Sequence, residues 1–144
     1  MTTQYPRSPK VRLGGIAHLG RMIDKIRLRH AGRIPDYNYL TVGFDRYLLE
    51  FLELDGAALE QQVLSEGTDA ELVVWVQAHM RKRSPEEIAQ WNLRIETSGP
   101  MDDAGKGRFQ QRIKDIAHKR GVPVSTLPPV STWADVIELD EGRL

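Results

Sequence analysis

The chain has 144 residues, the size of one ordinary domain, and its 40% hydrophobic and 28% charged residues are typical of a globular protein. It contains no cysteine, which excludes a disulfide framework, a thiolate metal site and a cysteine nucleophile. No apolar run approaches the ~20 residues that a membrane span needs, and residues 1–10 contain none that could serve as a signal peptide. We therefore expect a cytoplasmic protein.

The net charge of zero hides a gradient along the chain. Residues 1–33 hold eight Lys and Arg against one acid, residues 34–80 hold one Arg against nine acids, and residues 81–144 hold eleven basic and ten acidic side chains. Either the basic end binds an anionic partner or the first two segments pair with each other, mainly through the acidic 45–71 segment. We favour internal pairing, because most charge runs are solvated or paired faces.

The first predicted elements are an extended segment and a helix. Residues 11–13 precede Gly14 and Gly15, which are typical of a turn. Spacings of three and four then predict one apolar helix face ending at Gly32. The residues of that face are Ile16, Leu19, Ile23, Ile26 and His30.

The next part of the chain predicts an irregular segment and two helices. Residues 34–43 favour an irregular segment or a short strand, because Pro35 blocks a helix. Asp45 has the position of an N-cap before a broad apolar stripe. Asp55 similarly predicts the start of a short helix that ends at Gly67.

Two capping boxes are the clearest local signals of helix starts. They span residues 68–71 and 84–87, and in each a hydroxyl can accept from the backbone amide three residues on. Pro85 suits a first helical position, where its missing amide costs nothing. Each box is followed by an apolar face containing a tryptophan.

The C-terminal third predicts two more helices. Residues 98–100 break the chain, a helix containing Phe109 then ends at Gly121, and Ser131 is placed to cap a final short helix. The whole pattern predicts a mainly α-helical single domain over residues 1–144, with about six helices. We expect at most a small strand pair in the N-terminal third and a flexible arm at residues 1–10.

Arg21, Lys25 and Arg29 form one ridge of the first predicted helix. Like charges spaced by four residues repel one another, so an anionic group should face them. This group can be a phosphorylated small molecule, another protein subunit or the acidic 45–71 segment. The other subunit can be a second copy of this chain. The helix has no aromatic side chain for base stacking, which argues against nucleic acid.

Trp91 and Asn92 form the second candidate site. The start fixed by the second capping box places them on one helix face with Ile88 and Ile95. A buried amide must find hydrogen-bond partners. We favour a structural bond from Asn92 to a neighbouring loop, and the alternative is an apolar ligand pocket.

The residues that usually carry catalysis or bind metals form no recognisable pattern. No two of the four histidines are three to five residues apart, so no helix face presents a metal pair. The serines lie at caps and in loops, and no nucleophile elbow is present. The sequence therefore names no catalytic residue, metal or cofactor.

Several stretches, in order along nearly the whole chain, resemble a bacterial family known only as a domain of unknown function, numbered five-zero-six-nine. Gly20 departs from the expected family pattern, which has a proline at this position. The resemblance implies no activity, cofactor or catalytic residue. The matching stretches are Pro6–Pro9, Leu13–Gly15, Arg21–Lys25, Asp45–Arg46, Arg83–Ala89 with Trp91–Asn92, Thr132–Trp133 and Leu139–Arg143.

The function is thus unknown from the sequence, and two hypotheses are carried forward. The first is a non-catalytic binding or interaction protein that presents its basic first helix to an anionic ligand or partner. The alternative is a small enzyme or ligand-binding protein with an apolar pocket near Trp91 and Asn92. An enzyme would need titratable groups with shifted pKa values that converge in a cleft.

Overall fold

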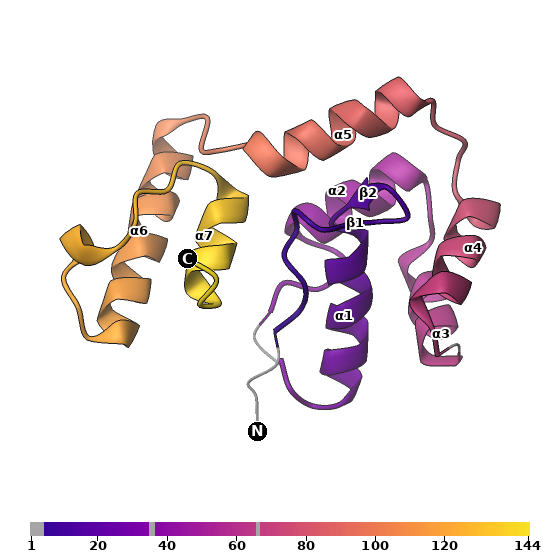
Figure 1. Cartoon of the computed structure of the whole chain (residues 1–144), viewed down its shortest axis with the longest axis horizontal. Helices are drawn as coiled ribbons and strands as arrows, with labels where there is room; N and C mark the ends of the chain where they lie inside the picture. The colour runs from indigo at the N-terminus through magenta and orange to yellow at the C-terminus, as the bar shows by residue number, and fades with distance from the viewer. Residues whose placement is uncertain (1–4, 35–36, 66) are drawn as a thin grey trace. The chain divides into compact units, whose positions relative to one another are not determined.

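The computed structural model describes residues 5–34, 37–65 and 67–144, and the prediction of a mainly α-helical protein is confirmed (Figure 1). Within these ranges there are seven α-helices, against about six predicted, and one short 3-10 helix, η1 (Val124–Thr126). None of the described helices is long and apolar enough to cross a membrane. The α-helices are α1 (Leu19–His30), α2 (Gly43–Leu52), α3 (Gly56–Ser65), α4 (Asp69–His79), α5 (Pro85–Thr97), α6 (Asp103–Arg120) and α7 (Trp133–Asp140).

The chain divides into two compact units, Met1–Ile95 (unit 1) and Glu96–Leu144 (unit 2). Each unit has its own hydrophobic core. In unit 1 the core gathers residues of β2, of the first four helices and of α5, including Met22, Leu52 and Trp91. In unit 2 it consists of Phe109, Ile116, Val136 and Leu139, from α6 and α7. That the chain forms one domain stays a prediction.

A two-stranded hairpin precedes α1, in agreement with the prediction of at most a small strand pair in the N-terminal third. Strands β1 (Arg12–Leu13) and β2 (Ile16–Ala17) pair antiparallel around the predicted glycine turn. The helix therefore begins at Leu19, three residues later than its apolar pattern indicated. Gly20 lies where an added Cβ would stand 3.1 Å from the Arg7 guanidinium, so the glycine leaves room for that side chain.

The predicted flexible arm at residues 1–10 is held against α1 in the part that the structure describes. The backbone N–H of Arg7 donates to Asp24 of α1 at 2.9 Å. Ser8 is 6% exposed, and the carbonyl of Pro9 accepts a bond from the N–H of His18. Residues 1–4 lie outside the described residues.

The segment before α2 is irregular in its described residues, which is the first of the two predicted alternatives. Residue 34 and residues 37–42 form no strand, and residues 35 and 36 lie outside the described part of the chain. Asp45 does not cap α2, because the helix starts at Gly43 and Val42 precedes it without a side-chain cap. The Asp45 side chain is instead fully buried inside unit 1. Tertiary partners, described below, account for its position.

The capping predictions for α3, α4 and α5 agree with the structure. Asp55 accepts from the Ala58 amide at 3.2 Å, and Thr68 from the Glu71 amide at 3.2 Å. At α5 the box is reciprocal, because Ser84 Oγ accepts from the Glu87 amide and Glu87 accepts from the Ser84 amide. Both partners of each cap lie within three residues of one another, so a short stretch of sequence is enough to predict the cap.

Candidate functional site

The predicted ridge on α1 is largely turned into the protein. Arg21 and Lys25 are only 4% and 5% exposed, while Arg29 is exposed. Arg21 donates to the carbonyl of Arg7 at 3.2 Å, and the Arg29 guanidinium lies 4.3 Å from the centre of the Tyr39 ring. The three residues therefore do not form one solvent-facing surface. Their role in binding an anion stays a prediction.

Lys25 belongs to a buried polar cluster that the sequence did not reveal. Asp45 Oδ1 lies 2.6 Å from His18 Nε2 and 3.2 Å from Lys25 Nζ, and Asp45 Oδ2 accepts from the Leu40 amide at 3.0 Å. Because a carboxylate only accepts, His18 carries its proton on Nε2. Among the described residues, His18 Nδ1 is buried without a hydrogen-bond partner.

Burial and charge set the protonation states in this cluster. Burial of His18 lowers its pKa to about 4, against the opposing effect of the hydrogen bond to Asp45, so the imidazole is neutral at pH 7. Burial alone would raise the pKa of Asp45, but hydrogen bonding to His18 and the charge of Lys25 outweigh it and hold that pKa below its usual value. The cluster is therefore a neutral histidine beside a buried ion pair.

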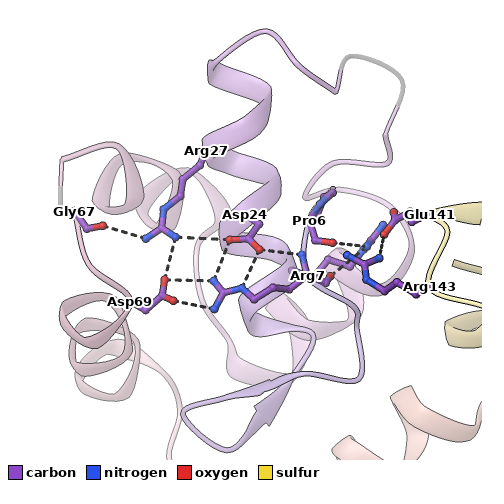
Figure 2. A network of polar contacts seen from close by, with 9 residues as sticks. Pro6, Arg7, Asp24, Arg27, Gly67, Asp69, Glu141 and Arg143 are labelled. Carbon is purple, nitrogen blue, oxygen red and sulfur yellow. Dashed lines mark hydrogen bonds and ion pairs between the residues drawn. The ribbon is translucent and has the colours of Figure 1, made fainter. Parts of the chain in front are cut away.

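A second network joins the start of the chain to α1 and α4. Figure 2 shows Arg7 and Arg27 converging on Asp24 and Asp69. Arg7 contacts both carboxylates at 2.8 Å, and Arg27 Nη1 lies 2.9 Å from Asp69 Oδ1. The hydrogen bond from Arg7 lowers the pKa of Asp69. This network links the basic first segment with the acidic second one.

The charge gradient along the sequence is thus matched by contacts inside unit 1. Besides the Arg7–Asp69 and Arg27–Asp69 pairs, Lys25 binds Asp45 and His30 Nε2 lies 3.2 Å from Glu60. All these pairs join residues 1–33 to residues 34–80. The geometry favours the internal interpretation of the charge asymmetry.

Trp91 and Asn92 both form hydrogen bonds with the backbone of the hairpin before α1. Asn92 is 4% exposed; its Oδ1 accepts from the Ala17 amide at 2.7 Å and its Nδ2 donates to the Gly15 carbonyl at 2.9 Å. Trp91 Nε1 donates to the Ala17 carbonyl at 3.0 Å, and its ring stacks on Phe51. These contacts are the structural bond that we favoured for Asn92.

A shallow groove of about 540 Å³ opens on the surface beside α2. Half-buried leucines, Leu40, Leu49 and Leu54, form its apolar part. Exposed polar residues surround them, and the rim includes an Arg46–Glu50 ion pair at 3.2 Å. The remaining lining residues are Thr41 and Glu53.

The sequence reasoning missed His18, Asp45 and the groove. His18 lies three residues after Gly15, and Asp45 has the position of an ordinary cap, so no local signal marks either one. Among the described residues, no group of three or more His, Cys, Asp or Glu side chains could hold a metal ion.

Comparison with known protein families gives a match along the chain. Residues 3–143 match the family described as "Domain of unknown function (DUF5069)". No curated protein matches the chain. Because the match spans almost the whole sequence, the chain belongs to the DUF5069 family, whose function is not known.

Proposed function

We propose that this protein is a non-catalytic interaction protein that receives an apolar side chain of a partner protein in the groove beside α2. The observation that supports this proposal is the composition of the groove. Half-buried Leu40, Leu49 and Leu54 line it together with exposed side chains that carry charges of both signs. Protein interfaces combine an apolar centre with a polar rim in the same way.

The shape of the groove favours a protein over a small molecule. Small-molecule sites enclose most of the ligand surface, whereas this groove is shallow. A partner protein would supply the missing cover with its own surface. Because the rim carries Arg46 and two glutamates, Glu50 and Glu53, we expect the partner's apolar side chain to be flanked by both an acidic and a basic residue.

The two hypotheses from the sequence have less support from the geometry. Arg21 and Lys25 of the basic first helix are buried, and Lys25 is paired inside unit 1. Trp91 and Asn92 use their polar atoms to hold the hairpin. We also propose a bacterial, cytoplasmic setting, which the absence of cysteine and the family resemblance suggest.

The proposal is tested by selecting displayed helical peptides that bind the purified protein and mapping them by methyl NMR. Selected peptides should shift the methyl signals of Leu40, Leu49 and Leu54. Leu49→Ala should weaken their binding at least about tenfold, as truncation of an interface centre does. Val74→Ala changes a 66% exposed residue on α4 and serves as the matched control, with no expected loss. Peptides that bind Leu49→Ala with unchanged affinity would refute the proposal.

A further inference from the structure

The buried cluster around Asp45 holds together three parts of unit 1. His18 precedes α1, Lys25 lies two turns along α1, and Asp45 belongs to the first turn of α2. Their exposed fractions are 1%, 5% and 0%. Through the Leu40 amide, Asp45 also holds the segment that precedes α2. One carboxylate thus accepts bonds from three directions.

Two of the residues held by Asp45 have an unfavourable backbone conformation. His18 has φ 73° and Leu40 has φ 54°, which is the left-handed region that side chains with a Cβ disfavour. Such residues persist only where surrounding contacts fix them. The bonds to Asp45 supply such contacts at both positions, so their loss would favour relaxation of both segments.

The charges around His18 make this arrangement sensitive to protons. The charged groups that act on His18 are Asp45 from α2 and Lys25 and Arg21 from α1. A proton on Nδ1 would add a further buried positive charge beside those of Lys25 and Arg21. Among the described residues, that nitrogen has no acceptor to stabilise the added N–H. A protonated His18 is therefore much less stable in the closed cluster than in water.

We propose that His18, Lys25, Asp45 and Leu40 form an acid-sensitive latch, which holds residues 37–42 against the buried cluster while His18 is neutral and releases them when His18 is protonated. Leu40 also lines the groove beside α2. Release of the latch would therefore change the groove, a consequence that rests on the proposed function. The latch itself is independent of any partner.

The latch predicts a steep pH dependence of local opening in the free protein. Burial holds the pKa of His18 at about 4 in the closed state, whereas an open, solvated His18 has its ordinary value of 6.5. The open state then binds a proton that the closed state does not. The equilibrium constant for opening should rise about tenfold for each pH unit between these two values as the pH falls.

Hydrogen exchange of the Leu40 amide tests the latch, with protection corrected for the intrinsic exchange rate at each pH. We expect protection to fall about tenfold per pH unit as the pH decreases from 6.5 towards 4. His18→Gln keeps a donor for Asp45 but cannot be protonated, so it should remove this slope. His118→Gln changes an exposed histidine of α6 and should leave the slope intact.

Titration of the His18 ring by NMR in the unmodified protein keeps the test decisive if His18→Gln fails to fold. A His18 that titrates near 6.5, or a Leu40 protection that does not change with pH, would overturn the latch. Both measurements use the free protein and no peptide. The proposed peptide-binding function and the latch can therefore be refuted independently of each other.

Discussion

Unit 1 and unit 2 differ in the length of chain that their polar contacts bridge. In unit 1, Asn92 binds a carbonyl 77 residues away and Arg7 binds a carboxylate 62 residues away. In unit 2, the Trp133 amide binds the carbonyl of Ser98 at the other end of the unit's chain, the Lys119–Asp140 pair spans 21 residues and the Thr132 cap spans three. Long contacts specify how distant segments meet, whereas short ones specify where a helix starts. The two units should therefore respond differently to loss of a polar group.

The largest expected effect is that of Asp45→Ala in unit 1. Removing the carboxylate takes away the acceptor that lies 2.6 Å from His18 Nε2 and the ion-pair partner that lies 3.2 Å from Lys25 Nζ, both in a buried site. Breaking a buried pair in this way costs about 3–5 kcal/mol. Urea unfolding followed by fluorine NMR of 5-fluorotryptophan measures it, since Trp91 reports on unit 1 and Trp133 on unit 2.

The control for Asp45→Ala is Glu50→Ala, which breaks the exposed ion pair with Arg46. This change should cost no more than about 1 kcal/mol. The Trp133 transition should stay in place in both variants. Equal shifts of the Trp91 and Trp133 transitions would contradict the comparison and show that the two units unfold as one.

Acid should destabilise unit 1 next most strongly. The pKa of His18 is about 4 in the folded state against 6.5 in the unfolded chain, so the unfolded chain takes up a proton first as the pH falls. The stabilising contribution is complete above pH 6.5 and is lost as the pH falls towards 4, by roughly 3 kcal/mol. Urea midpoints of the Trp91 signal at successive pH values measure this loss. A midpoint independent of pH would contradict it.

Asn92→Ala should have a smaller effect on unit 1, about 1–3 kcal/mol, because it leaves the Ala17 amide and the Gly15 carbonyl without their partners. Asn92→Leu should not restore stability, since an apolar side chain satisfies neither group. Gln111→Ala, which removes an exposed side-chain bond to Asp115 in α6, is the matched control with little effect. A stable Asn92→Ala protein would instead revive the ligand-pocket hypothesis for this face.

Much of the fold could be predicted where a contact is local. The capping box at Ser84 and Glu87 fixed the start of α5, and with it the inward direction of Trp91 and Asn92. The prediction that the first helix includes Ile16 was wrong, because Ile16 fits both a helix face and a short strand. Pairing with Leu13 decides in favour of the strand, and local sequence does not show that pairing.

The candidate site was harder to predict, because its chemistry depends on segments far apart. The spacing of Arg21, Lys25 and Arg29 predicts that they share one side of the helix. It does not show that Arg21 and Lys25 are buried. Lys25 is buried beside Asp45, with which it forms an ion pair. The position of Asp45 before an apolar stripe is also that of an ordinary N-cap, so the sequence does not distinguish the two roles. The groove is lined by residues 40–54 alone, but the local sequence does not show how the segments on either side of α2 bring Leu40 and Leu54 to one surface.

The smallest predicted loss of stability follows from removing one of two neighbouring hydroxyls, Ser131 and Thr132, at the start of α7. The sequence indicated Ser131 as the cap, but the structure shows Thr132 in this role, accepting from the Asp135 amide at 3.0 Å. Thr132→Ala should therefore lower the Trp133 unfolding midpoint by an amount equivalent to about 1 kcal/mol. Ser131→Ala should change it by no more than about 0.5 kcal/mol.

This pair of variants tests the short-range character of unit 2. The lost bond lies within one helical turn, so the Trp91 transition of unit 1 should not move with either variant. If Ser131→Ala were the more damaging change, the helix would start one residue earlier, as its local pattern indicated. If Thr132→Ala moved the Trp91 transition as well, the cap would stabilise more than its own unit, and the contrast between long-range and short-range contacts would have to be abandoned.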